Sequence, residues 1–389
     1  YRVVKKSKKI VKQMLYNTTI FEDMGFAYYG PFDGHDVENL IHVLENAKRM
    51  HQPVLLHMVT NKGKGYAFAE ERPDTFHGVS KFDVATGEGS AVSGESFSNT
   101  FGEHICKLAE ENDQICAITA AMQTGTALNE FGIRFPKRFF DVGIAEEHAV
   151  CFAGGLAAGG SLPVFAVYST FLQRGYDQII HDVSIDPLHI VFAIDRAGIS
   201  GEDGETHQGL FDAAFLATIP HMTVLCPANE RELRAALCRA VEEETGPVAI
   251  RYPKAESAAA HNIVPLQKGD WQVVSVAHRA QAVVFAVGSM VGPAMMAADT
   301  LALEGLEVEV VNCRKVKPLP DRMLEKYARL PIVTLEENAV LGGFGAQVAV
   351  HARVLAEGEE AFLRYLAALG AGKLAFGKTK EDYQAWETE

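Results

Sequence analysis

The stretch that decides the fold reads FDVGIAEEHAV and spans residues 140–150. It has the pattern of a strand end, a short turn and a helix start, with the carboxylate of Glu146 at the junction. Residues 151–160 are small and mostly apolar, so we expect the helix to be buried. A buried carboxylate is costly unless another group stabilises it. From these residues alone two interpretations stay open: Glu146 caps its own helix, where the helix dipole favours a negative charge, or it serves a ligand.

Short β-rich runs alternate with helical patterns on both sides of this stretch. Such alternation predicts an α/β fold in which helices cover parallel sheets. In the central part of the chain we expect strands at 115–119, 139–142, 164–168, 189–194, 223–226 and 248–252. We expect helices there at 98–110, 145–158, 171–184 and 229–244.

Changes in composition divide the chain into segments. In chain order we infer a remnant domain at 1–80, a Gly/Ser-rich linker at 81–95, a complete α/β domain at 96–255, a connector at 256–280 and a last domain at 281–389. The first segment shows one helix pattern at 37–50 and one strand at 53–60, which cannot cover both faces of a sheet. We therefore interpret it as the end of a domain whose earlier part is absent from the chain. The last domain is expected to alternate strands at 282–287, 307–312 and 332–336 with helices at 291–304, 321–330 and 345–357.

The composition excludes several classes of protein. Of the 389 residues, 48% are hydrophobic and 22% are charged, as in ordinary soluble globular proteins. The net charge of −14 disfavours binding to nucleic acid. No apolar stretch reaches membrane-spanning length without a charge or a turn signal, which disfavours a membrane protein. The six cysteines are scattered without a CxxC spacing, which favours reduced thiols in a cytoplasmic protein.

Four further segments combine polar side chains with turn residues: YSTFLQRGYDQ at 168–178, DRAGISGEDGETHQG at 195–209, RYPK at 251–254 and TFH at 75–77. The first three follow expected strands, and the carboxyl ends of parallel strands meet at the ligand-binding edge of a sheet. That edge would carry Tyr168, Arg174, Arg196, Asp203, His207 and Arg251. Each of them alone is more often an ordinary surface or loop residue, but their convergence predicts a binding site.

Six strings of the chain resemble one family: FFDVGIAEEHAV (139–150), VYSTFLQRGYDQIIHDV (167–183), DRAGISGEDGETHQG (195–209), YYGPFDGHD (28–36), NKGKGY (61–66) and EENAVLGGFG (336–345). They are similar to the 1-deoxy-D-xylulose-5-phosphate synthases, a transketolase-like family that depends on thiamine diphosphate. Transketolases and the E1 β-type subunits of 2-oxo-acid dehydrogenases share the fold and the cofactor glutamate, but the STFLQR and THQG strings favour the synthases. A naturally short, non-catalytic paralogue is a further alternative.

The resemblance implies a pyrimidine-binding domain at 96–255, a transketolase C-terminal domain at 281–389 and a remnant of the diphosphate-binding domain at 1–80. It also implies a cytoplasmic homodimer with transferase activity and with thiamine diphosphate and Mg²⁺ as cofactors. The implied reaction decarboxylates pyruvate and condenses it with D-glyceraldehyde 3-phosphate. The products would be CO₂ and 1-deoxy-D-xylulose 5-phosphate, a precursor for isoprenoids, thiamine and pyridoxal.

The resemblance assigns catalytic and cofactor roles to five residues. Glu146 would hydrogen-bond a pyrimidine ring nitrogen of thiamine diphosphate, which favours the ligand interpretation of this carboxylate. Phe171 would stack on the pyrimidine, and Arg174 would lie beside it. His77 and His207 would act in proton transfer and hold the intermediate, because histidine titrates near working pH.

The substrate residues follow from the same resemblance. Arg196 and Arg251 would bind the substrate phosphate, because guanidinium groups bind phosphate oxygens in pairs. Tyr168 and Asp203 would position the aldehyde. Lys62 would face the cofactor diphosphate, although a solvated loop lysine is an equal alternative.

The chain departs from the family pattern in two places. The GDG…N metal motif does not occur, so we expect the Mg²⁺ ligands in the absent amino-terminal part. Asp203-Gly204 with Asn229 has a similar spacing, but Glu202 stands where the first glycine belongs. Residues 363–389 lack the usual final pattern of the family. We therefore expect the chain alone to be inactive.

Overall fold

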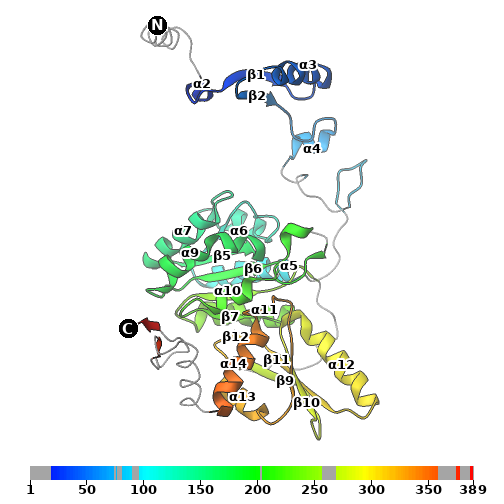
Figure 1. Cartoon of the computed structure of the whole chain (residues 1–389), viewed down its shortest axis with the longest axis vertical. Helices are drawn as coiled ribbons and strands as arrows, with labels where there is room; N and C mark the ends of the chain where they lie inside the picture. Colours follow the sequence, from blue (N-terminus) through cyan, green and yellow to red (C-terminus); the bar gives the residue numbers. More distant parts are fainter. Residues whose placement is uncertain are drawn as a thin grey trace. The chain divides into compact units, whose positions relative to one another are not determined.

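The structure, a computed structural model, describes residues 19–73, 76, 81–89, 96–201, 204–255, 269–357, 374–376 and 386–388 (Figure 1). The chain forms two compact units, residues 1–93 and 94–389. Among the described helices, none has the length and the apolar character needed to cross a membrane.

The first unit pairs two strands in parallel. Its elements are α2 Ile20–Asp23, β1 Ala27–Asp33, α3 Val37–Lys48, β2 Val54–Val59 and α4 Ala67–Glu71. The prediction of one strand and one helix was wrong, because it missed β1. Gly30 and Pro31 lie inside β1, where the pairing register is interrupted. In a sequence such residues indicate a turn, so the strand is visible only through its pairing with β2.

The second unit contains a seven-stranded sheet with the order β12-β7-β8-β6-β5-β3-β4. Its strands are β3 Ile115–Thr119, β4 Phe139–Asp141, β5 Leu162–Tyr168, β6 Val191–Asp195, β7 Thr223–Leu225, β8 Val248–Arg251 and β12 Lys315–Lys317. Six of them run parallel, and β12 pairs with β7 in the antiparallel direction. β3, β6 and β8 are buried along their whole length, as expected for parallel strands covered on both faces. The predicted α/β fold is therefore confirmed.

Helices cover both faces of this sheet. They include α5 Phe97–Glu111, α6 Asn129–Arg134, α7 Glu146–Ala158, α10 Asp212–Ala217 and α11 Glu230–Glu242. Phe101 on α5 and Leu237 on α11 belong to the apolar core of one face. Ala149 and Ala153 on α7 belong to the core of the other face. We did not predict α6 and α10, because a six-residue helix is too short to show a helical period in the sequence.

The helix that we expected at 171–184 is broken into four pieces. They are α8 Ser169–Leu172, η1 Gln173–Gly175, α9 Tyr176–Gln178 and the π-helical η2 Ile179–Ser184. Gly175, with φ −91° and ψ 10°, interrupts the regular helix. Glycine has a low helix propensity, which is consistent with a break at this position.

A second sheet, with the order β13-β10-β11-β9, forms the C-terminal part of this unit. Its elements are β9 Trp271–Ser275, β10 Ala282–Ala286, α12 Val291–Leu303, β11 Val308–Cys313, α13 Asp321–Tyr327, β13 Ile332–Leu335 and α14 Phe344–Glu357. β9 lies inside 256–280, which we expected to be a connector, and it pairs antiparallel with β11. Our reading of residues 363–389 falls mostly outside the described residues, which include there only the paired strands β14 Leu374–Phe376 and β15 Trp386–Thr388.

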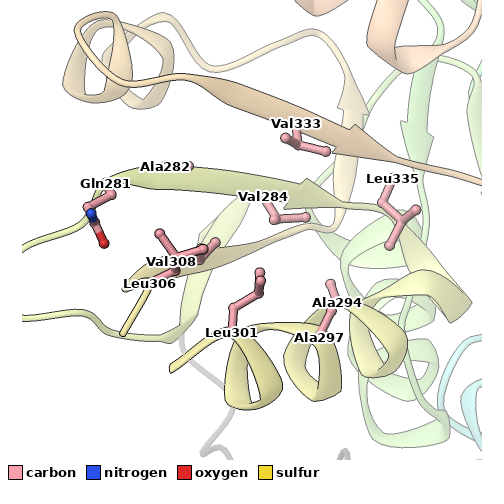
Figure 2. A pocket seen from close by; sticks show the side chains of 10 residues that line it. All are labelled: Gln281, Ala282, Val284, Ala294, Ala297, Leu301, Leu306, Val308, Val333 and Leu335. Carbon is pink, nitrogen blue, oxygen red and sulfur yellow. The ribbon is translucent and has the colours of Figure 1, made fainter. Parts of the chain in front are cut away.

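An apolar groove of about 470 Å³ lies between α12 and this second sheet (Figure 2). Figure 2 shows Leu301 of α12 facing Val284 and Val308 of the sheet across the groove. Gln281 is the one polar side chain in its lining, and no titratable group lines it. The groove therefore offers no acid, base or nucleophile for catalysis.

Candidate active site

Glu146 is the first residue of α7, which begins at the carboxyl end of the parallel sheet. Its side chain is only 2% exposed, and its Oε2 atom accepts a hydrogen bond from Nη1 of Arg174 at 3.2 Å. Within the described residues, Arg174 gives the only hydrogen bond to this carboxylate. A helix cap would instead accept hydrogen bonds from the first backbone amides of the helix. The side chain of Glu146 therefore makes no capping hydrogen bond in its own helix, although its place at the start of α7 still suits the helix dipole, and its role toward a ligand stays a prediction.

Arg174 reaches Glu146 because η1 lies unusually close to α7. A Cβ atom at Gly175 would stand 2.8 Å from Cγ2 of Val150 on α7, so only glycine permits this approach. The side chain of Arg174 is 50% exposed, whereas that of Glu146 is buried. Solvent therefore reaches the ion pair from the side of Arg174, while Glu146 is shielded.

Three rings lie together beside this ion pair. Tyr168, the last residue of β5, stacks on Phe171 with the ring centroids 5.9 Å apart. The ring of His207 meets Phe171 edge-on at 5.3 Å. The guanidinium carbon of Arg174 lies 5.7 Å from the centroid of Phe171. The structure thus brings these four predicted residues together next to Glu146.

Arg196 follows β6 and borders this cluster. Its guanidinium carbon lies 4.0 Å from the ring centroid of Tyr168, within the range of a cation–π interaction. Its Nη1 atom donates a hydrogen bond to the Gly125 carbonyl at 2.6 Å and lies 3.0 Å from Oδ1 of Asp195. Burial raises the pKa of Asp195, and the charge of Arg196 acts in the opposite direction. Arg196 is therefore placed at the predicted site with part of its donors already engaged.

The loop after Arg196 begins at Gly198 and ends at Gly209. These two glycines exchange both backbone hydrogen bonds, at 2.9 and 2.8 Å, and so close the neck of the loop. Inside the loop the side chain of Gln208 accepts a hydrogen bond from the Ser200 amide at 2.8 Å. His207 belongs to this loop, whose position beside α8 is also held by the hydrogen bond from the Thr170 hydroxyl to the Thr206 carbonyl at 2.9 Å.

Arg251, the last residue of β8, binds Asp212 rather than the ring cluster. Its Nε atom donates to Oδ2 of Asp212 at 3.0 Å, and its Nη2 atom donates to Oδ1 at 3.1 Å. Their side chains are 6% and 0% exposed. Burial acts to lower the pKa of Arg251, but the charge of Asp212 outweighs it and holds the pKa above its ordinary value. This geometry does not support a phosphate-binding role for Arg251, because a carboxylate already occupies its guanidinium fork.

Three predicted residues cannot be joined to this cluster. Asp203 and His77 lie outside the described residues. Lys62 is exposed and follows β2 in the first unit. Their roles stay predictions. Among the described residues, no group of three or more His, Cys, Asp and Glu side chains could hold a metal ion.

Sequence reasoning did not single out Asp212, Glu337 or Asn338. Nδ2 of Asn338 donates a hydrogen bond to Oδ1 of Asp212 at 3.1 Å, across 126 positions of the chain. Arg251 also donates to the Glu337 carbonyl at 3.3 Å. The string EENAVLGGFG contains Glu337 and Asn338, but nothing in its pattern indicates what they touch.

Three family models match the chain. The model described as "1-deoxy-D-xylulose-5-phosphate synthase" matches residues 1–60, "Transketolase, pyrimidine binding domain" matches 94–258, and "Transketolase, C-terminal domain" matches 269–367. The site described above lies within the second match, and Glu337 and Asn338 lie within the third.

Two curated proteins that are similar to this chain share the name 1-deoxy-D-xylulose-5-phosphate synthase. The 1-deoxy-D-xylulose-5-phosphate synthase of Clostridium tetani is 47% identical over 348 residues, which cover 88% of this chain and 56% of the relative. The enzyme of that name from Magnetococcus marinus is 48% identical over 348 residues, with the same coverage. The chain therefore spans about half the length of the curated relatives that it matches.

Solved structures agree on the fold. The structure titled "Split gene transketolase, inactive beta4 tetramer" is 30% identical, with a TM-score of 0.59, and the match covers 67% of this chain and 85% of that one. A transketolase mutant from Pichia stipitis has a TM-score of 0.55 over 81% of this chain and 60% of that one, and at 15% identity it shows the fold alone. The matched family models, the curated relatives and the shared fold together show that the chain belongs to the 1-deoxy-D-xylulose-5-phosphate synthases, a transketolase-like family that depends on thiamine diphosphate.

Proposed function

We propose that this chain forms the pyrimidine-binding and C-terminal parts of a 1-deoxy-D-xylulose-5-phosphate synthase. The reaction decarboxylates pyruvate and joins the remaining two carbons to D-glyceraldehyde 3-phosphate, which yields 1-deoxy-D-xylulose 5-phosphate and CO₂. The observation that carries the proposal is the buried carboxylate of Glu146, which the start of α7 presents beside Arg174 and Phe171. The similarity to the curated synthases supports the choice of substrates.

The residues of the site fit the pyrimidine side of thiamine diphosphate. A flat aminopyrimidine needs an apolar wall and a polar partner for its ring nitrogen. Phe171 and Tyr168 offer the aromatic wall, and Glu146 offers a buried hydrogen-bond acceptor held by a single arginine. When bound, the cofactor supplies the electron sink for the loss of CO₂.

Glu146 would hold the proton of the pyrimidine ring nitrogen through a charge-assisted hydrogen bond. Its 2% exposure keeps water away from that bond, and Arg174 fixes the side chain in one orientation. A preorganised carboxylate needs no reorganisation when charge develops in the reaction, which is the main source of electrostatic catalysis.

The neighbouring side chains would bind the aldehyde. Tyr168 and His207 would orient its carbonyl end, and His207 would transfer a proton to the oxygen there. Arg196 would meet the phosphate, since a guanidinium binds two phosphate oxygens at once. The face of Tyr168 holds the guanidinium of Arg196 in place for that contact.

The remaining assignments rest on the family alone. We propose that Asp203 positions the aldehyde, that His77 acts in proton transfer and that Lys62 faces the cofactor diphosphate. Mg²⁺ would be bound by residues outside this chain. We further propose a cytoplasmic homodimer whose partners are the two substrates, without nucleic acid or membrane.

An enzyme of the relatives' full length that contains this chain is expected to make 1-deoxy-D-xylulose 5-phosphate from pyruvate and D-glyceraldehyde 3-phosphate, with thiamine diphosphate and Mg²⁺. The 389-residue chain alone is expected to show no turnover, because the family places the diphosphate and metal ligands elsewhere. Mass spectrometry of the products checks both expectations.

Two results would contradict this proposal. Transfer of a two-carbon unit from a ketose phosphate, without decarboxylation of pyruvate, would identify a transketolase. A full-length enzyme that binds the cofactor but converts neither substrate would indicate a non-catalytic paralogue. Robust turnover by the purified 389-residue chain would overturn the expectation for the chain alone.

Arg196→Ala in the full-length enzyme is expected to raise the KM for D-glyceraldehyde 3-phosphate by about ten- to hundredfold, the effect of a charge-assisted contact worth roughly 1.5–3 kcal/mol. Steady-state kinetics with an unphosphorylated aldehyde serve as the comparison. The KM for that aldehyde should rise much less, because the aldehyde has no phosphate that Arg196 could bind. Equal losses with both aldehydes would mean that Arg196 only holds Tyr168 and Asp195.

A further inference from the structure

Residues 337–339 of the C-terminal part lie against the segment that follows the loop of His207. The backbone amide of Ala339 donates a hydrogen bond to the Leu210 carbonyl at 2.7 Å, directly after Gly209. Nδ2 of Asn338 donates to Oδ1 of Asp212 at 3.1 Å. These contacts join the two sheets of the second unit at the base of the predicted site.

The side chain of Glu337 meets the other end of that loop. A Cβ atom at Gly198 would stand 2.8 Å from Oε2 and 3.0 Å from Cβ of Glu337, so the side chain packs directly on the Gly198 backbone. Gly198 has a φ of 82°, which favours glycine independently of this contact. The hydroxyl of Ser289, in the short turn that precedes α12, donates a hydrogen bond to Oε2 of Glu337. The hydrogen bond from Ser289 thereby holds the carboxylate at its far end, against the loop.

The neck of the loop is therefore supported on both sides. Glu337 packs on Gly198, and Ala339 binds the residue after Gly209. The two glycines also bind each other. A loop with a fixed neck loses fewer conformations when it binds a ligand, which is how a rigid scaffold preorganises a site.

We propose that Glu337 is a positioning residue, which holds the neck of this loop so that the ring of His207 stays against Phe171. The catalytic importance of Glu337 rests on the proposed function. Its effect on the position of the loop is independent of that function. Glu337 would not touch the substrate, because its carboxylate is directed to Ser289. The C-terminal part would thus contribute to the reaction through the loop that it supports.

Amide hydrogen exchange of the 389-residue chain tests the support of the loop. In Glu337→Ala we expect peptides from residues 199–210 to exchange about tenfold faster than in the unchanged chain, while peptides from β6 keep their protection. Glu337→Gln should stay close to the unchanged chain, because its amide oxygen can still accept the hydrogen bond from Ser289. Glu325→Ala is the matched control, because it removes an exposed glutamate of α13 in the same C-terminal part of the chain. It should change neither the exchange of residues 199–210 nor that of β6.

Kinetics of a full-length enzyme test the positioning role. Glu337→Ala should lower kcat for D-glyceraldehyde 3-phosphate by about tenfold or more, while CO₂ release from pyruvate alone stays close to normal, because a loosened His207 spends less time in place. Glu337→Gln should restore most of the rate. The KM for pyruvate should not change in either variant.

Two outcomes would overturn the proposal. Unchanged exchange of residues 199–210 in Glu337→Ala would show that Glu337 does not support the loop. Faster exchange with an unchanged kcat would show that the support has no catalytic role. If Glu337→Ala loses protection throughout the chain, Ser289→Ala replaces it, since that change frees the carboxylate without leaving a gap beside Gly198. An inactive unchanged enzyme would contradict the proposed function, whereas the exchange result would still decide what Glu337 does to the loop.

Discussion

Replacing Glu146 by alanine in a full-length enzyme is expected to lower kcat by orders of magnitude and to leave the fold intact. A removed electrostatic or proton-transfer group typically costs more than about 2–3 kcal/mol of transition-state stabilisation. The fold should tolerate the change, because it removes a buried charge and leaves behind Arg174, whose side chain is half exposed and can bind water instead. Steady-state kinetics and thermal unfolding of the same preparations measure the two effects.

Glu147→Ala is the matched control for this prediction. Glu147 is the next residue of α7, yet its side chain is exposed where that of Glu146 is buried. A helix turns by about 100° per residue, so the two carboxylates point in different directions. We expect a mild effect at Glu147, and equal losses at both positions would mean that the wrong carboxylate was assigned. Binding of thiamine diphosphate, measured by calorimetry, would separate lost activation from lost affinity.

Breaking the buried pair of Arg251 and Asp212 is expected to destabilise the 389-residue chain by about 3–5 kcal/mol, because the remaining buried charge then has no opposite charge beside it. Asp212→Ala leaves the guanidinium of Arg251 buried and also removes the acceptor of Asn338. The double variant Asp212→Ala/Arg251→Met should recover part of the loss, since no unpaired charge remains. Urea unfolding followed by circular dichroism compares both variants with the unchanged chain.

The exposed pair of Glu130 and Arg134 is the matched control for the buried one. These side chains are an i, i+4 pair on α6 with a distance of 3.1 Å, but they are 59% and 32% exposed. Solvent screens such a pair, so Glu130→Ala should cost less than about 1 kcal/mol. If Asp212→Ala lowered the free energy of unfolding by an equally small amount, burial would not be what makes the pair of Arg251 and Asp212 important for stability.

Steady-state kinetics and urea unfolding of a full-length variant in which Arg251 alone is replaced decide between two roles for Arg251. If Arg251 binds the substrate phosphate, as the resemblance implies, its replacement should raise the KM for the phosphorylated aldehyde without a loss of stability. If its role is the ion pair with Asp212, stability should fall and both kinds of aldehyde should be affected alike. The structure favours the second outcome, because both donor positions that face Asp212 are engaged.

Local patterns were sufficient to predict most of the central sheet. β3, β5, β6 and β8 are short apolar runs between turn signals, and each was expected within a few residues of its place. Buried parallel strands leave this trace because both of their faces need apolar side chains. The position of Glu146 at a strand-to-helix junction could be predicted for the same reason, since an apolar strand, a glycine turn and a small-residue helix adjoin it in the chain.

Elements that depend on distant pairing could not be predicted. β9 and β12 have no marked period of their own, and each is a strand only because a neighbour far along the chain binds its backbone. β1 contains Gly30 and Pro31, so its local preference contradicts its tertiary role. The expected helix at 171–184 failed in the opposite way, because its apolar period continues through Gly175 although the backbone does not.

The sequence by itself determined the family, the parallel α/β architecture and the set of residues that end its strands. Only the tertiary structure decided which of those residues lie beside Glu146 and which form structural contacts elsewhere. Tyr168, Phe171, Arg174 and His207 meet beside Glu146, whereas Arg251 is bound to Asp212 and supported by the carbonyl of Glu337. The physical reason is that apolar and turn patterns are local, so they can be read along the chain, while a buried charge is stabilised by whichever partner the folded chain brings within hydrogen-bond distance.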